Sequence, residues 1–140
     1  MSPALALFCR EYQQLSATNL HVLTDIYAPD IYFADPAHHI QGITDLVAYF
    51  DGLFSSVSEC RFDIEQVMEQ EGEAFVRWQM HFAHPRLNGA KLVSVPGVSH
   101  VCFAEKITQH IDYYDLGALL YEQIPLLGGV IRTLKRRLSQ

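Results

Sequence analysis

The sequence has few cysteines and no long hydrophobic run, and each absence excludes classes of protein. Its three cysteines, Cys9, Cys60 and Cys102, are an odd number, and no two have the close spacing of a metal-binding or redox pair. We interpret them as reduced thiols in a cytoplasmic protein, and we expect no metal and no cofactor. No segment approaches the roughly 20 apolar residues of a membrane-spanning helix. The short apolar stretch near the start does not have the pattern of a secretory signal.

Basic residues are scarce outside the end of the sequence. Four of the 10 Lys and Arg lie in the last nine residues, whereas the 16 Asp and Glu are spread over the rest. Because an acidic surface repels phosphates, we expect no nucleic-acid partner. The basic tail alternates with apolar residues at helical spacing between 127 and 138. Such a helix can lie on an anionic membrane, but we expect it to close the fold or to pack on a partner subunit.

The hydrophobic residues, 49% of 140, change their period along the chain. In the first part they recur every three to four residues, which predicts helices over residues 3–15, 20–28 and 43–54. Pro29 should end the second helix, because the residue before a proline avoids the helical conformation. The same period returns after the last strand and predicts a C-terminal helix in two pieces, divided around Pro125.

Segments with the two-residue period of strands lie between these helices. Ile31–Ala34 predicts a short strand, and four longer strands joined by tight turns follow from Cys60 onward. Pro96-Gly97 predicts a bulge or bend in the third long strand. Helices grouped ahead of antiparallel strands define the α+β class. We therefore expect one domain over residues 1–140, a cone-shaped, curved antiparallel (mixed) sheet packed by N-terminal helices, with a C-terminal helix.

Two segments carry a family pattern. Ile26–Pro36 ends in Asp35-Pro36 and is followed by Gly42 and a helix that contains Ala48-Tyr49-Phe50. Together with the last strand, Ile107–Asp115, this pattern resembles the nuclear-transport-factor-2-like superfamily, above all its SnoaL-like cyclases and ketosteroid isomerases. The resemblance implies a cone with an internal pocket and a homodimer formed through the sheet face. It leaves the reaction open, because that superfamily includes isomerases, cyclases, epoxide hydrolases, dehydratases and proteins without catalysis.

The resemblance also implies candidate catalytic residues. Asp35 matches the general base of ketosteroid isomerases, and Tyr12 lies near the position of their enolate-binding tyrosine. A protonated acid is the third group in those enzymes, and Ser99 stands at its position here, which departs from the isomerase pattern. SnoaL-like cyclases carry an acid on the final strand, and Asp112 matches it. Independently of the resemblance, His38 and His39 directly follow Asp-Pro-Ala, so one of the two rings, with His38 as the candidate catalytic residue, can orient Asp35 or carry a proton.

If the face of the last strand that carries Asp112 is the inner one, the pocket holds two carboxylates from opposite ends of the chain. In such a pair one member can hold a proton while the other accepts one. His110 and Tyr114 share a face of the last strand with Asp112. The residues expected to line the pocket are Tyr32, Tyr49, Trp78, Met80, Ser99, Phe103, His110 and Tyr114.

Each candidate catalytic residue also has a structural interpretation. Asp35 can simply end a strand in an Asp-Pro turn, and Asp112 can pair with a basic group at the sheet edge. Tyr12 can be a core residue, and His38-His39 can be a surface loop pair.

We therefore expect a protein that binds, or acts on, a small hydrophobic molecule by isomerase-, cyclase- or hydrolase-type proton transfer without a metal. One alternative is a non-catalytic binding module of the same fold. Another is an interaction protein that dimerises through an exposed sheet face. The residues of that face would be Phe75, Arg77, Gln79 and His81. His100 and His110 can meet His81 across neighbouring strands, but no spacing in the sequence is typical of zinc.

Overall fold

A computed structural model describes residues 1–86, 89, 91–119 and 133–139. Its elements in chain order are α1 (Pro3–Tyr12), the 3₁₀ helix η1 (Leu20–Val22), α2 (Leu23–Ile26), β1 (Tyr27–Ala34), β2 (His39–Gln41), α3 (Ile43–Ser56), β3 (Glu59–Gln70), β4 (Glu73–Ala83), β5 (Val93–Phe103), β6 (Ile107–Tyr114) and α4 (Leu116–Leu119). Residues 133–138 form a further helix. The break expected around Pro125 lies outside the described residues.

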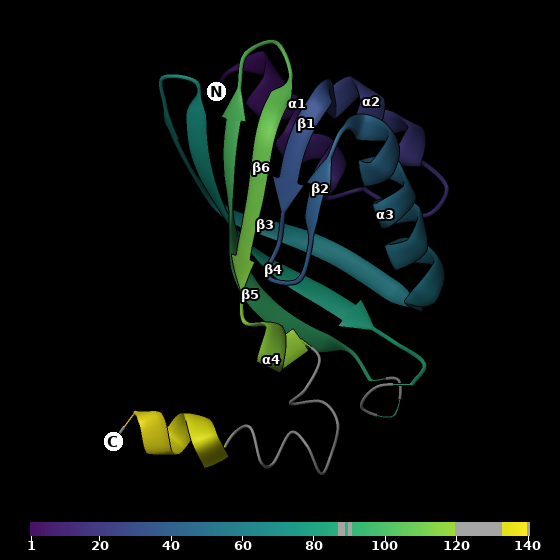
Figure 1. The fold of residues 1–140 in the computed structure, drawn as a ribbon, viewed down its shortest axis with the longest axis vertical. Coiled ribbons are helices and arrows are strands. Elements are labelled where there is room, and N and C mark those ends of the chain that lie inside the picture. Colours follow the sequence, from purple (N-terminus) through teal and green to yellow (C-terminus); the bar gives the residue numbers. More distant parts are fainter. Residues whose placement is uncertain (87–88, 90, 120–132, 140) are drawn as a thin grey trace.

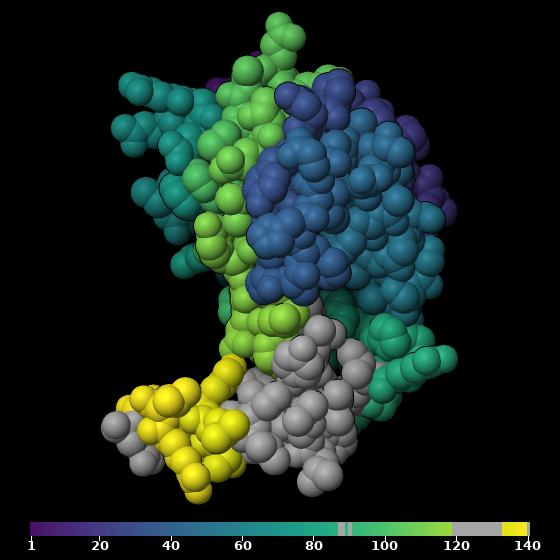
Figure 2. Space-filling model, viewed as in Figure 1, coloured from purple at the N-terminus to yellow at the C-terminus, as the bar shows by residue number. Residues whose placement is uncertain are grey.

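A six-stranded sheet forms the frame of the molecule, with the strand order β2-β1-β6-β5-β4-β3. Neighbouring strands are antiparallel except β1 and β6, which run parallel. The sheet curves, and α1, α2 and α3 lie along one side of it (Figure 1). On the face shown in Figure 2, the residues of β1 and β2 lie between β6 and α3. This is the α+β architecture with a curved mixed sheet that the sequence predicts.

The core fills the space between these helices and the inner face of the sheet. Alternate residues of β4 are buried, as the two-residue period requires, and the outward residues between them are more exposed. The buried ones are Val76, Trp78, Met80 and Phe82. α1 and α3 contribute apolar side chains at three- and four-residue spacing, namely Leu5, Phe8, Tyr12, Leu46, Phe50 and Phe54. No helix of the described part is long and apolar enough to cross a membrane.

The second predicted helix is shorter than expected. It ends at Ile26, and β1 begins at Tyr27 and runs through Pro29. Tyr27 is already extended because it pairs with Ile107 of β6. The ladder then shifts register between Tyr27 and Tyr32, where the proline cannot donate a backbone hydrogen bond. Pairing with a strand that is distant in sequence thus overrides the local helical signal.

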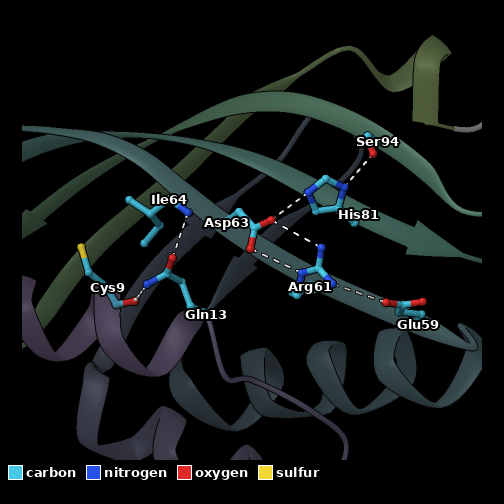
Figure 3. A network of polar contacts seen from close by, with 8 residues as sticks. All are labelled: Cys9, Gln13, Glu59, Arg61, Asp63, Ile64, His81 and Ser94. Carbon is cyan, nitrogen blue, oxygen red and sulfur yellow. Dashed lines mark hydrogen bonds and ion pairs between the residues drawn. The ribbon is translucent and has the colours of Figure 1, made fainter.

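Of the bulge or bend that the sequence predicts at Pro96-Gly97, the bulge is wrong. β4 and β5 pair without a shift from Glu73↔Cys102 to Phe82↔Val93. β3 has a register shift against β4 between Ile64 and Gln66, and β5 has one against β6 between Cys102 and Phe103. At the shift in β3 the Ile64 N–H donates to Gln13 Oε1 at 3.0 Å, which ties β3 to the end of α1 (Figure 3).

Gly97 has a packing role. It pairs with Trp78, and a Cβ at Gly97 would lie 2.3 Å from the indole Cη2. The indole is buried and donates from Nε1 to Ser99 Oγ at 2.8 Å. The glycine therefore leaves the space that the tryptophan ring occupies.

The outer face of the sheet carries exposed apolar side chains. Phe75 and Met68 are directly opposite each other on β4 and β3, and both are exposed, as is Tyr113 of β6. This is the face through which the sequence predicts self-association, and the homodimer stays a prediction. At the other end of the chain, Lys135 of the last helix donates a hydrogen bond to Asp115.

We predict that Gly97→Ala destabilises the protein by about 1–3 kcal/mol, the usual cost of overpacking a core. Chemical denaturation with urea, followed by circular dichroism, measures the change. Gly52→Ala is the matched control, because a Cβ there meets no atom within 4 Å. Gly52 lies inside α3, so this change should stabilise the helix by about 1 kcal/mol. Equal stability of wild type and Gly97→Ala would contradict the packing role.

Candidate functional site

Asp35 lies at the end of β1, where its carboxylate is held by four donors. Oδ1 accepts from the backbone N–H groups of Ala37 (2.9 Å) and His38 (2.8 Å). Oδ1 also lies 3.1 Å from His38 Nδ1, which must carry the proton because an ionised carboxylate only accepts. Oδ2 accepts from the Tyr49 hydroxyl at 2.5 Å. The side chain is therefore buried but fully supported, as a buried charge requires.

The partners of Asp35 face a cavity of about 490 Å³ between α3 and the sheet. His38 and Tyr49 form part of its wall, next to the end of β6. Most of the remaining wall is apolar, including Leu53, Val57, Met80, Phe82 and Leu116. A mainly apolar cavity with a few polar groups is typical of sites for small molecules.

Asp112 belongs to a second polar group, which is buried inside the sheet. Its Oδ1 lies 2.5 Å from Ser99 Oγ and 2.6 Å from His110 Nε2. His110 Nδ1 lies 2.7 Å from the Tyr27 hydroxyl, and Ser99 Oγ accepts from the Trp78 indole. Ser99 and Asp112 face each other on β5 and β6. The result is a continuous chain of hydrogen bonds from Trp78 to Tyr27.

The direction of these hydrogen bonds follows from the chemistry of their ends. Burial raises the pKa of Tyr27 well above its ordinary value, and the charge of Asp112 adds to the effect. Tyr27 therefore keeps its proton and donates it to His110 Nδ1, which leaves the Nε2 proton for Asp112. Trp78 can only donate, so the Ser99 hydroxyl accepts from it and donates to Asp112. Ser99 and His110 thus both donate a hydrogen bond to the carboxylate of Asp112.

Asp35 and Asp112 line a common cleft of about 380 Å³ at the carboxyl ends of β1 and β6. The parallel ladder of these strands ends at Ala34↔Ile111, and each aspartate is the next residue along the chain. Tyr114 lines both this cleft and the larger cavity. Burial raises the pKa of Tyr114, and the charges of Asp35 and Asp112 raise it further. Its hydroxyl is therefore a neutral donor near both carboxylates.

One further polar group has the composition of a hydrolytic triad. Ser94 Oγ lies 2.6 Å from His81 Nδ1, and Asp63 Oδ2 lies 3.0 Å from His81 Nε2 (Figure 3). Arg61 and Glu59 continue the row along β3. These residues come from three neighbouring strands and line neither cavity, so we interpret them as a cross-strand ladder.

The SnoaL-like domain model matches residues 10–110 of the sequence, well over half of the chain. The chain belongs to the SnoaL-like domain family. The matched part of this SnoaL-like domain includes Asp35, Tyr49 and His110 and ends two residues before Asp112. No curated protein sequence matches it.

Solved structures place the SnoaL-like domain in the nuclear-transport-factor-2-like fold. It is similar to a predicted SnoaL-like polyketide cyclase from Jannaschia sp. CCS1, with a TM-score of 0.73 and 19% identity over 86% of this chain and 93% of that one. An NTF2-like protein of unknown function from Burkholderia pseudomallei has a TM-score of 0.76 and 15% identity, over 89% of this chain and 99% of that one. A protein with a ketosteroid isomerase-like fold from Catenulispora acidiphila was solved in complex with trimethylamine. It has a TM-score of 0.74 and 16% identity, over 88% of this chain and 93% of that one. At these identities the likeness shows the fold.

In the structure, most of the predicted site residues lie around two hollows, the larger cavity and the cleft. Met80, His38 and Tyr49 line the larger cavity, Tyr32 lines the cleft, and Tyr114 lines both. Ser99, Trp78 and His110, which are expected to line the pocket, line neither the cavity nor the cleft. They lie behind Asp112 in the buried chain of hydrogen bonds.

Two predicted site residues lie elsewhere in the SnoaL-like domain. Tyr12 lines neither hollow and packs against the rings of Phe8 and Phe62 in the core. Phe103 ends β5 at the opposite end of the sheet. The predicted meeting of His81, His100 and His110 does not occur, because His110 pairs with Val101 on the inner face and His100 points outward.

Sequence reasoning missed Tyr27 and Cys60. Tyr27 looked like the end of a helix, and its contact with His110 spans 83 positions. Only the parallel pairing of the first and last strands, a general feature of the resembled fold, could have indicated it. Cys60 begins the long hairpin and lies in the wall of the larger cavity.

We predict that Cys60 reacts slowly with alkylating reagents. Burial raises the pKa of its thiol to about 12, so the thiolate fraction at pH 8 is only about one in ten thousand. Allowing for the stronger nucleophilicity of a more basic thiolate, iodoacetamide should modify native Cys60 roughly a hundredfold more slowly than an ordinary cysteine. The rate should rise about tenfold per pH unit between pH 8 and 10. Peptide mapping by mass spectrometry, with urea-unfolded protein as the control, checks this; equal rates in both states would contradict it.

Proposed function

We propose that this SnoaL-like domain holds a small hydrophobic molecule that lies in the larger cavity and extends past Tyr114 into the cleft lined by Asp35 and Asp112. There it moves a proton on the molecule, in an isomerase- or cyclase-type reaction. The observation that carries the proposal is the position of Asp35. Its carboxylate is buried, and the two side chains that bond it, His38 and Tyr49, form part of the cavity wall. A base supported in this way keeps its orientation while a ligand approaches.

The larger cavity supports a ligand of low polarity. Its walls come from α3, β4 and the end of β6, and they carry mainly aliphatic, aromatic and methionine side chains. Its volume of about 490 Å³ lies within the range of pockets that enclose small organic molecules. Among the described residues, polar side chains that interrupt the apolar wall and would orient a ligand include His38, Tyr49, Ser56, His84 and Tyr114.

Asp35 is the proposed general base, and Tyr114 is the proposed donor to a ligand oxygen. Removal of a proton beside a carbonyl leaves charge on the oxygen, and a neutral hydroxyl stabilises that charge by a hydrogen bond. Tyr114 keeps its proton because burial and both aspartates raise its pKa. Tyr114 thus takes the role that the resemblance implied for Tyr12.

Asp112 is the proposed second carboxylate of the reaction. It shares the cleft with Asp35 and Tyr114, and it is oriented from behind by Ser99 and His110. A fixed second acid–base group allows a proton to leave one position of a ligand and return at another. Similarity to a predicted polyketide cyclase agrees with this type of chemistry.

A non-catalytic binding module is the second candidate function. The observation that favours it is the number of protein donors on Asp35, since three of its four hydrogen bonds converge on Oδ1. In that case the aspartate would serve to fix the loop after β1. The two candidate functions share the cavity and differ in whether Asp35 takes part in proton transfer.

Filling the cavity should abolish binding in either case. Gly52 lies in its wall, and a side chain added there meets open space. We predict that Gly52→Leu weakens the binding of the fluorescent apolar dye Nile red by at least about tenfold, which is about 1.4 kcal/mol. Because leucine favours the helix more than glycine does, unfolding would not explain the loss. Ser55→Leu, on the same helix but outside the cavity wall, is the control and should bind the dye like wild type. Equal dye binding by both variants would mean that the cavity is not the binding site.

Replacement of Asp35 should distinguish the two functions. We predict that the wild type accelerates deuterium exchange at carbon next to the carbonyl in a panel of apolar ketones, measured by proton NMR. Asp35→Asn keeps the shape of the side chain and should slow this exchange by about 10²- to 10⁴-fold. Asp30→Asn, an exposed aspartate of the same strand, is the matched control. Exchange that survives in Asp35→Asn would exclude this base. Dye binding by wild type without any exchange would favour the binding module.

A further inference from the structure

A second group of chemically active side chains lies on the opposite side of the sheet from the cavity. Within the described residues, one set of three potential metal ligands converges, namely Glu73, His100 and Cys102. One ligand atom from each lies within 4.8 Å of the other two. None of the three lines the cavity or the cleft. The proposed reaction does not use them.

The sheet register brings these residues together. His100 and Cys102 are two positions apart on β5, so their side chains point to the same face. Glu73 begins β4 directly opposite Cys102. Directly opposite and diagonal positions on one face are the pairs whose side chains can touch. The three side chains therefore come from a rigid, paired part of the sheet.

Neighbouring side chains hold this group in place. His100 Nε2 lies 2.6 Å from Glu73 Oε1 and 4.0 Å from Cys102 Sγ. The Phe75 ring stacks on the His100 ring, with centroids 4.5 Å apart and planes at 8°. The side-chain amide of Gln109, on β6 opposite Cys102, lies 3.9 Å from Sγ. Partners that orient the ligands from outside are a regular feature of metal sites.

We propose that Glu73, His100 and Cys102 bind one Zn²⁺ ion on the outer face of the sheet. Carboxylate oxygen, imidazole nitrogen and thiolate sulfur are all ligands of zinc, with bonds of roughly 2.0–2.3 Å. A tetrahedral ion with such bonds needs ligand atoms roughly 3.3–3.6 Å apart. The distances of 2.6 Å and 4.0 Å lie on either side of this range. Glu73 is half exposed and free to adjust by a small rotation.

The charges of the three ligands suit a divalent cation. The Glu73 carboxylate and the Cys102 thiolate together balance the two positive charges of the ion, and His100 binds through a neutral ring nitrogen. As the sulfur–zinc bond forms, the S–H bond breaks and its proton leaves to solvent. Without a cation, burial and the charge of Glu73 raise the pKa of Cys102. With three protein ligands, the fourth position of the ion is open to water or to another group.

A simpler interpretation is an ion pair between His100 and Glu73 across the strands. Such a pair needs no cysteine, and it would not create a metal site with a sulfur ligand. The role of Cys102 therefore decides between the two interpretations.

Cobalt titration tests the site, because Co²⁺ occupies zinc sites and is coloured. Untagged, chelator-treated protein under reducing conditions is titrated with Co²⁺ and then with Zn²⁺. We expect one Co²⁺ per chain, a near-ultraviolet sulfur-to-cobalt band, intense visible bands of a tetrahedral ion, and loss of all of them as Zn²⁺ displaces the cobalt.

Variants identify the ligands. Cys102→Ser should remove the sulfur band, and Cys102→Ser, His100→Ala and Glu73→Gln should each weaken zinc affinity by at least about tenfold, the lower bound for loss of a supporting partner. Cys60→Ser and His81→Ala are the controls, and both should keep the band and the affinity. Circular dichroism verifies that each variant is folded. The absence of a sulfur band in wild type, or a band that persists in folded Cys102→Ser, would overturn the proposal.

Discussion

The parallel pairing of β1 with β6 is the contact on which the rest of this structure depends. It joins the first strand to the last and so places the helical N-terminal part beside a sheet built from the second half of the chain. Because parallel strands end at the same edge, it also brings Asp35 and Asp112 into one cleft, 77 positions apart in sequence. The loop that follows β1 then folds back on Asp35 through two backbone N–H groups. Without this pairing the two carboxylates would not line the same cleft.

Polar groups inside this sheet are tolerated because each has a partner. Ser99 and His110 are fully buried, and Asp112 nearly so. Within the described residues, no buried side-chain nitrogen or oxygen is without a hydrogen-bond partner. Loss of one partner would leave a buried group unsatisfied, at a cost of about 1–3 kcal/mol, or more for a charge. A chain of this kind fixes the orientation of Asp112 more tightly than a solvated aspartate could be fixed.

The sheet separates two kinds of chemistry by the alternation of its side chains. Inward residues of β4, β5 and β6 form the core and the support of Asp112, whereas outward residues carry exposed apolar rings, a polar ladder and the Glu73, His100 and Cys102 group. A one-residue slip of any strand would exchange these sets. The regular register between β4 and β5 depends in turn on Gly97, which leaves room for the Trp78 ring.

The sequence by itself determined the fold class, the approximate positions of the four long strands and the fact that His110, Asp112 and Tyr114 share one face of the last strand. These features follow from the period of the hydrophobic residues and from family motifs around Asp35, which are local properties of the chain. The C-terminal limit of the second helix and the regular pairing at Pro96-Gly97 could not be predicted, because strand pairing and packing against Trp78 override local preference.

Only the tertiary structure decided which polar groups meet. The bond of Tyr27 to His110, the support of Asp35 by Tyr49 and the place of Tyr114 between two hollows all join residues from different elements. The convergence of Glu73 with His100 spans 27 positions and depends on the exact register of β4 and β5. A hydrogen bond tolerates a variation of only a few tenths of an ångström in the distance between donor and acceptor. A sequence pattern specifies the face of a strand on which a side chain lies, but not its distance from a side chain across the sheet.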